Sequence, residues 1–274
     1  MTEEDLRRRP IASYATSSDS WRQQILKRTL ELARGGQRLE RLYKKNRHKL
    51  AASEDFWTIC LKELDLNLIF DEAKILAIPS SGPLLVVANH PFGFADGLAL
   101  GHVISLVRSD QKLLAHSVFE KIPETHKHFI PIKFSQGSSA LRENLKSMKI
   151  AKEHLKSGGC IMIFPAGQVA ASKTIFGKVE DAEWKVFCAK LVQFCNPIIL
   201  PVYFSGQHGW LFQLLVKLGD SWREGMHVGN LVQQLGTDIN LTIGNPIKSS
   251  ELGNLSNRGE VMLKLREIVF SLKP

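Results

Sequence analysis

The chain has 274 residues, of which 44% are hydrophobic and 23% are charged, and its formal net charge is +9. This length and composition predict a globular protein with one large domain, or with one domain and a small appendage. No stretch of about 18 or more apolar residues occurs, which argues against an integral membrane protein with spanning helices.

The N-terminal part of the chain is polar at first and then helical in pattern. Residues 1–20 have mixed charge and no apolar signal-peptide segment, so we expect a flexible terminus and a cytoplasmic protein. Apolar residues at helical spacing predict a helix over 21–33, ended by the glycines at 35–36, and a second helix over about 37–50. Ser53 is the expected N-cap of a third helix. We therefore predict a basic helical region over 21–73.

The positive charge is concentrated in these helices. Residues 21–49 hold ten Lys and Arg against Glu31 and Glu40, which gives this segment +8 of the total +9. Such a segment suits nucleic acid or an anionic membrane surface. Nucleic acid is the weaker alternative, because few aromatic residues are interleaved with the charges and no recognised binding motif occurs. Two interpretations stay open: apolar stripes that only pack on the main domain, and helices that also dock on a membrane.

From about residue 74 short apolar runs alternate with helical patterns. Runs of continuous apolarity are typical of strands that are covered on both faces. The predicted strands are 84–88, 160–164, 197–204 and 239–243, and the predicted helices are 97–108, 139–157, 181–194, 209–218 and 257–271. This alternation predicts an α/β fold in which a largely parallel central sheet is flanked by helices, with the N-terminal basic helices as an appendage. The α/β domain would cover 74–274.

The cysteines indicate a reducing compartment. The chain has no CxxC pair, and each cysteine lies in an apolar stretch, so we expect reduced core thiols and no metal site. These residues are Cys60, Cys160, Cys188 and Cys195.

Three polar or glycine-rich loops directly follow predicted strands. They are "NHPFGFADG" (89–97), "PAGQVAAS" (165–172) and "SGQHGW" (205–210). Because ligands bind at the carboxyl ends of parallel strands, these loops are expected to converge on one cleft. We expect His208, in the third loop, to be a surface or packing residue.

The first loop places His90 six positions before Asp96. A histidine is the usual general base near neutral pH, and a carboxylate partner fixes its tautomer and stabilises the imidazolium. No serine lies nearby, so the attacking hydroxyl would belong to a substrate. The alternative is that Asp96 caps the apolar helix that follows. In the second loop, N–H groups near Gly167 could hold an anion or oxyanion, or the loop could be an ordinary strand-to-helix turn.

The ordered motifs "NHPFGFADG", "GGCIMIFPAG" and "NPIILPVYFSG" resemble the successive blocks of the PlsC-like glycerolipid and lysophospholipid acyltransferases. The resemblance covers about residues 82–247, and "IGNPI" is similar to the closing strand of that family. Five residues separate His90 from Asp96, whereas four are common in the family. This spacing resembles the hemolysin-like and ornithine-lipid-type branch.

The resemblance implies an acyltransferase of membrane lipid synthesis. It would move a fatty acyl group from acyl carrier protein or coenzyme A to the hydroxyl of a lysolipid, of lysophospholipid or lyso-ornithine-lipid type. His90 would be the general base and Asp96 its partner, without a bound cofactor or metal. Membrane lipids with an anionic surface would be partners at the cytoplasmic face, where the N-terminal helices dock. The implied substrate-binding residues are Asn89, Gly93, Lys133, Phe164, Pro165, Ala166, Gly167 and Gln168.

The chain departs from the common pattern in the third block. Ala166, Gln168 and Val169 stand where the family commonly has Glu, Thr and Arg. Loss of that arginine removes a bidentate phosphate donor, which favours another lysolipid over lysophosphatidic acid. Lys133, with Arg142 nearby, falls where a charged residue near the acceptor is expected. Two other functions remain as alternatives: a lipid hydrolase that uses the same pair, and a non-catalytic lipid-binding protein.

Overall fold

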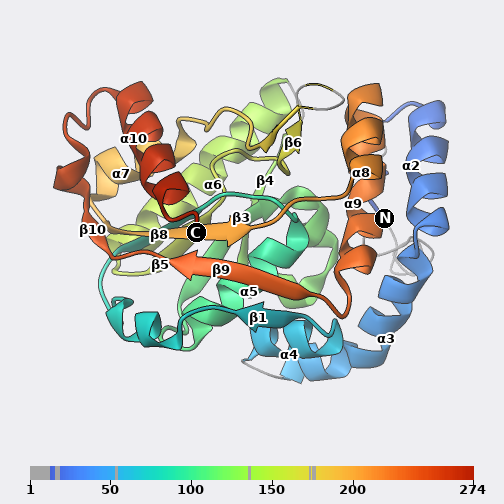
Figure 1. Cartoon of the computed structure of the whole chain (residues 1–274), viewed down its shortest axis with the longest axis horizontal. Coiled ribbons are helices and arrows are strands. Elements are labelled where there is room, and N and C mark those ends of the chain that lie inside the picture. The colour runs from blue at the N-terminus through green and yellow to red at the C-terminus, as the bar shows by residue number, and fades with distance from the viewer. Residues whose placement is uncertain (1–12, 16–18, 53–54, 135–136, 173, 175–176) are drawn as a thin grey trace.

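The structure is a computed structural model that describes residues 13–15, 19–52, 55–134, 137–172, 174 and 177–274. Within this part of the chain, an eight-stranded sheet runs in the order β1-β9-β8-β2-β5-β3-β4, and β10 also pairs with β8 (Figure 1). A separate small sheet joins β6 to β7. The strands are β1 (Asn67–Ile69), β2 (Leu84–Ala88), β3 (Gln111–His116), β4 (Phe129–Ile132), β5 (Cys160–Ile163), β6 (Ala171–Ser172), β7 (Val179–Glu180), β8 (Ile198–Ser205), β9 (Asp238–Ile243) and β10 (Ile247–Lys248).

Helices cover both faces of the sheet and one of its ends. Helices α2, α3, α8 and α9 stand at the end toward which the arrow of β8 points (Figure 1). The α-helices are α2 (Trp21–Ala33), α3 (Gly36–Ala52), α4 (Phe56–Glu63), α5 (Phe94–Ser105), α6 (Ser138–Lys156), α7 (Phe187–Cys195), α8 (Trp210–Leu215), α9 (Asp220–Gln234) and α10 (Arg258–Ser271). The 3-10 helices are η1 (Glu72–Ala77), η2 (Ser117–Lys121), η3 (Pro123–Thr125), η4 (Val216–Leu218) and η5 (Ser249–Leu252).

The sheet is mostly parallel, as the sequence predicts. Strand β2 pairs in parallel with β5 and β8, and β3 pairs in parallel with β4 and β5. Strands β9 and β10 run antiparallel to β8. The carboxyl ends of β2, β5 and β8 therefore lie together at one edge, and the three predicted loops leave the sheet from that edge.

Alternate residues of the central strand belong to two different apolar cores. Leu84, Val86 and Ala88 pack in the core that includes α4 and α5, whereas Leu85 and Val87 pack in the core of α6, α7 and α10. All five side chains are fully buried. This double coverage explains why the strand reads as a continuous apolar run, because neither face meets water.

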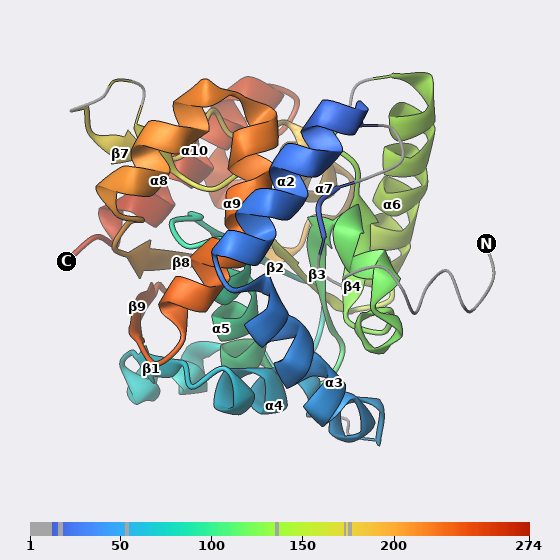
Figure 2. The same cartoon turned by 90° about the vertical axis from the view of Figure 1, so that its right-hand side faces the viewer.

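The N-terminal helices pack on the α/β domain. Helix α2 lies against α9 in both views (Figures 1 and 2). It ends before Gly35, where φ is +93° and where a Cβ would lie 2.9 Å from Val232. The indole of Trp57 in α4 lies on Gly101 of α5, where no Cβ could fit. Asp55 caps α4; the expected cap, Ser53, is outside the described residues, as is most of the terminus expected to be flexible.

Several cations of the basic segment are already paired. Among the described residues, acids from outside 21–49 neutralise three of the ten cations, which lowers the charge that the segment presents to a partner. Lys27 is almost fully buried in such a pair, so its charge does not reach the surface. The pairs are Lys27 with Asp19 and Glu224, Arg47 with Glu124, and Lys49 with Glu63.

The cysteine thiols are free. Cys160 and Cys188 are buried, and burial raises the pKa of both thiols to about 12, whereas Cys60 and Cys195 are half-buried. Two of the four thiols are therefore core residues, as expected, whereas the other two are only partly buried.

Two parts of the fold differ from the sequence-based prediction. The helix expected over 181–194 begins only at Phe187, because the polar groups of Asp181 and Trp184 bond to each other in a non-helical segment before it. Strands β1, β3, β4, β6 and β7 and helix α9 were not predicted, and β1 lies within the region 21–73 that was expected to be helical. No helix within the described residues is both long and apolar enough to cross a membrane.

Candidate active site

His90 and Asp96 meet where the chain leaves β2. The Nδ1 atom of His90 lies 3.0 Å from Oδ2 of Asp96, and the Asp96 side chain is fully buried. The same Oδ2 atom accepts hydrogen bonds from the N–H groups of Phe92 and Gly93, at 2.8 and 3.0 Å. Three contacts on one oxygen fix the carboxylate, which in turn orients the imidazole.

Asp96 also stabilises the start of α5, although not as its N-cap. The helix begins at Phe94, and the cap position belongs to Gly93, whose φ is +76°. Asp96 is the third residue of the helix and accepts the N–H of the cap from inside the first turn, where a negative charge is favoured. The sequence-based interpretation placed the N-cap at Asp96, which is three residues too late. Gly93 adopts a positive φ and is the N-cap itself, so the helix begins at Phe94.

The electrostatics of the pair have two opposed causes. Burial raises the pKa of Asp96, while the hydrogen bond to His90 and the two backbone N–H groups act to lower it. A carboxylate on Nδ1 leaves the Nε2 edge of His90 for a substrate proton. The His90 side chain is 17% exposed, so a ligand can reach it.

The second predicted loop holds His90 from another side. The ring of Phe164, after β5, stacks on the imidazole, with centroids 4.1 Å apart and planes 19° apart. The carbonyl of His90 accepts the N–H of Ala170 at 2.8 Å. The loops after β2 and β5 thus form one site, as their position at one sheet edge predicts.

Asp181 contacts the same histidine and was missed from the sequence. Its Oδ1 atom accepts the backbone N–H of His90 at 3.1 Å, and its Oδ2 atom accepts the indole N–H of Trp184 at 2.9 Å. The side chain is 7% exposed, and burial raises its pKa. A lone aspartate inside an expected helix gave no sequence signal for this contact.

The turn after Phe164 is closed by a hydrogen bond of its own. Gly167 has a φ of +67°, and its N–H donates to the Phe164 carbonyl at 3.0 Å. The Gly167 N–H itself is therefore occupied in the turn. Ala166 is fully buried, and the carbonyl of Pro165 accepts the N–H of Lys185.

The residues after this turn connect it to α9. The Oε1 atom of Gln168 accepts a hydrogen bond from Nη1 of Arg223, at 2.7 Å. Val169, which stands where the common motif has arginine, is 3% exposed and packs with Phe212 and Met226. An apolar contact thus occupies the arginine position, and α9 brings a different guanidinium, which the sequence did not reveal, to the neighbouring residue.

The remaining predicted site residues have structural partners. The Asn89 amide donates to the carbonyl of Phe204 and accepts its N–H, which ties the loop to β8. The Lys133 ammonium pairs with Glu143 at 2.7 Å. The substrate contacts expected for both residues stay predictions.

His208 is a packing residue, which is one of the two roles expected from the sequence. It is 3% exposed, and its ring contacts the rings of Phe92 and Phe212. Burial lowers the pKa of His208 to about 4, so the imidazole is neutral near pH 7.

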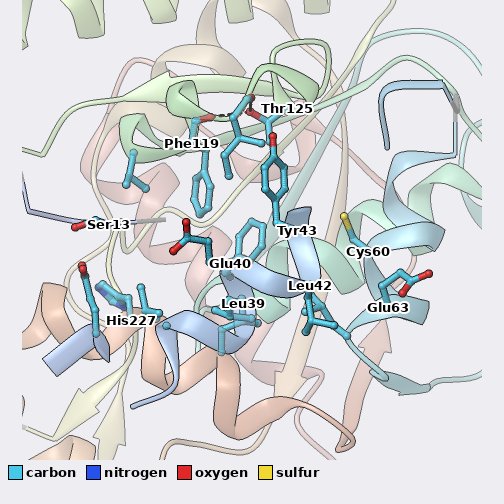
Figure 3. A pocket seen from close by; sticks show the side chains of 18 of the residues that line it. Ser13, Leu39, Glu40, Leu42, Tyr43, Cys60, Glu63, Phe119, Thr125 and His227 are labelled. Carbon is cyan, nitrogen blue, oxygen red and sulfur yellow. Dashed lines mark hydrogen bonds between the residues drawn. The ribbon is translucent and has the colours of Figure 1, made fainter. Parts of the chain in front are cut away.

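An apolar cavity of about 430 Å³ adjoins the site. Helices α2, α3, α4 and α9 and the turns η2 and η3 line it, and Phe94, two residues before Asp96, is part of its wall. Figure 3 shows Leu39 and Leu42 of α3 across from Phe119 and Thr125. This volume is in the range of small-molecule sites. The cavity walls come from residues between 13 and 231, and for this reason the sequence alone did not reveal it.

No group of three or more His, Cys, Asp or Glu side chains suited to a metal ion occurs among the residues that the structure describes.

A family model described as acyltransferase matches residues 43–273 of the chain. A lyso-glycine lipid O-acyltransferase of Phocaeicola vulgatus is 25% identical over 227 residues, which cover 80% of this chain and 77% of that protein. A protein of the same name from Bacteroides thetaiotaomicron is 27% identical over 176 residues, or 63% of this chain and 61% of that one.

Among solved structures, the chain is similar to the 1-acyl-sn-glycerophosphate acyltransferase PlsC from Thermotoga maritima. The two are 17% identical, with a TM-score of 0.48, over 91% of this chain and 95% of that one.

Proposed function

The chain belongs to the acyltransferase family, and from this premise we propose that it transfers a fatty acyl group from an acyl thioester to the hydroxyl of a lysolipid. The observation that carries the proposal is the 3.0 Å contact between His90 Nδ1 and the buried Asp96 carboxylate. Such a pair activates a hydroxyl that the protein itself does not supply.

In the proposed reaction, Nε2 of His90 removes the proton of the acceptor hydroxyl as its oxygen attacks the thioester carbonyl. Asp96 stabilises the imidazolium that forms. The tetrahedral intermediate then collapses, the carbon–sulfur bond breaks, and the leaving thiolate takes the proton back from His90. The products are an ester and a free thiol, and the histidine returns to its neutral form.

We propose that the cavity beside the site receives an acyl chain. Its walls are mainly apolar, and Phe94 connects it directly to the turn that holds Asp96. A hydrocarbon chain placed there would remove apolar surface from water, which stabilises the bound state.

The acceptor we favour is a lysolipid with an amino-acid head group. The curated relatives are lyso-glycine lipid O-acyltransferases, and the apolar packing of Val169 leaves no arginine there for a phosphate. A lyso-ornithine lipid belongs to the same chemical class. We propose the thioesters of acyl carrier protein and of coenzyme A as the two alternative acyl donors.

We also propose peripheral docking on an anionic membrane at the cytoplasmic face. Trp21 and Ile25 of α2 are 67% and 57% exposed, and Trp210 of α8 and Leu218 of η4 are 77% and 58% exposed. Helices α2 and α8 and the turn η4 all pack on α9. Exposed tryptophan and aliphatic side chains near basic residues suit the membrane interface.

The test is acyl transfer from acyl carrier protein and from coenzyme A to a panel of lyso-glycine, lyso-ornithine and lysophosphatidic acid acceptors. His90→Ala should lower the rate about 10²- to 10⁴-fold, which is the usual contribution of a general base. His48→Ala, at an exposed position of α3, is the matched control and should keep wild-type turnover. A folded His90→Ala protein with near-wild-type turnover would contradict the mechanism. Release of fatty acid without acceptor, at the same rate as transfer, would instead favour a hydrolase.

A further inference from the structure

The backbone of His90 is held at both ends by one segment of the chain. The segment 165–185 supplies the N–H of Ala170, which binds the His90 carbonyl at 2.8 Å, and the carboxylate of Asp181, which binds the His90 N–H at 3.1 Å. The short pair of strands β6 and β7 lies between these two contacts. The backbone of His90 is therefore fixed independently of the contact between its ring and Asp96.

The Asp181 side chain is fixed by hydrogen bonds to both of its oxygens. Both of its oxygens accept N–H groups, one from His90 and one from Trp184, which is itself 5% exposed. Each oxygen of Asp181 is therefore bound by a donor, and one of these two donors is the His90 backbone.

We propose that Asp181 is a positioning residue that fixes the backbone of His90 and thereby keeps its imidazole in the position that the reaction needs. The inference rests on the proposed function, since it concerns the same general base. Two carboxylates then act on one histidine from different sides: Asp96 on the ring and Asp181 on the main chain. Neither the family motif nor the His–Asp spacing includes this second acid.

The experiment compares Asp181→Asn with Glu180→Gln in the full-length protein. Asn keeps one acceptor but removes the charge and turns an N–H group toward a donor. Glu180→Gln removes the same charge one residue earlier, where the side chain pairs with Lys178 and is 41% exposed. We expect Asp181→Asn to lower kcat about tenfold to a hundredfold with KM within about twofold. Glu180→Gln should leave both unchanged.

A second readout does not need activity. In hydrogen exchange followed by NMR, the backbone N–H of His90 should exchange faster in Asp181→Asn than in the wild type, because Asn offers a single acceptor oxygen to the two donors that Asp181 binds. An unchanged kcat would overturn the proposal, as would a lower kcat with unchanged exchange of the His90 N–H. If the wild type transfers no acyl group to any acceptor, the proposed function fails, whereas the NMR comparison still decides the role of Asp181.

If Asp181→Asn does not fold, Trp184→Phe takes its place. This change removes the donor to Oδ2, together with part of a buried ring, and frees the carboxylate to rotate away from the His90 N–H. A severalfold lower kcat with unchanged KM and faster exchange of the His90 N–H would support the proposal. Wild-type values of both would overturn it.

Discussion

The imidazole of His90 lies flat against the ring of Phe164, with centroids 4.1 Å apart and planes 19° apart. The two residues follow neighbouring parallel strands, β2 and β5, so the sheet itself places one ring on the other. The stack occupies a face of the imidazole, and Asp96 holds Nδ1 at its edge. Together they restrict the ring to one orientation while Nε2 is left for the acceptor.

Phe164→Leu should therefore reduce turnover more than binding. Leucine keeps most of the buried apolar volume but not the flat surface, so the imidazole gains rotational freedom. We expect kcat to fall about tenfold with KM within about twofold, because small misplacements of a catalytic group cost much of its effect. Steady-state kinetics with the preferred acceptor would measure this. Phe194→Leu, at a 48% exposed ring of α7, should leave kcat unchanged; equal losses in both variants would refute the orienting role.

The buried histidines predict a loss of stability in acid. His208 has an ordinary pKa of 6.5 when unfolded and about 4 when folded, because burial disfavours its charged form. The unfolded chain therefore binds the proton first, and stability present above about pH 6.5 is lost as the pH falls toward 4. By pH 5 the loss from His208 alone is about 2 kcal/mol.

Urea unfolding at pH 7.5 and pH 5 would measure this loss. His208→Gln should reduce the difference in unfolding free energy between the two pH values by about 2 kcal/mol, whatever its effect at pH 7.5. His48→Gln, on the exposed side of α3, is the control and should keep the wild-type difference. An unchanged pH dependence in His208→Gln would show that its imidazole titrates normally in the folded protein.

The cavity predicts a chain-length preference. Val228 of α9 is 6% exposed and lines the cavity, so Val228→Phe would fill part of its volume. We expect kcat/KM for long acyl donors to fall about tenfold, while short donors stay within about twofold, since about 0.8 kcal/mol is lost for each methylene that is no longer buried. Competition between donors of different length would show the shift. Leu263→Phe, at a 66% exposed position of α10, is the control; an equal loss for short and long donors would place the acyl chain elsewhere.

The exposed tryptophans predict the mode of membrane contact. Trp21→Ser and Trp210→Ser should each weaken binding to vesicles that contain anionic lipid, and added salt should weaken the binding of all forms. Sedimentation of vesicles with bound protein would measure it. Trp184→Phe, whose indole is buried, should bind as the wild type does. Equal binding to neutral and anionic vesicles would contradict the electrostatic part of the docking proposal.

The elements with the strongest sequence pattern were predicted best. Strand β2 covers the expected residues, and β5, β8 and β9 lie within one residue of theirs at each end. Short apolar runs bounded by turn residues are typical of buried strands. The helix predicted to end at the glycines 35–36 does so because Gly35 adopts a positive φ. His90 and Asp96 could be paired because loop spacing and family resemblance pointed to the same two residues.

Other parts depend on contacts that no local pattern records. Strand β4 has only four residues, one of them Pro131, and gave no strand signal. Helix α9 mixes polar and apolar residues because one side packs on α2 and another side reaches the site through Arg223. Asp181 could not be recognised, because its role comes from a backbone N–H that lies 91 positions earlier in the sequence.

One exposed face of α2 borders the cavity. Trp21, Ile25, Arg28 and Leu32 repeat at helical spacing and are all exposed, and the last two also line the cavity. From Trp21 to Leu32 the helix rises about 16 Å. In the proposed docking mode, the same face of one helix would therefore contact the lipid surface and border the space offered to an acyl chain.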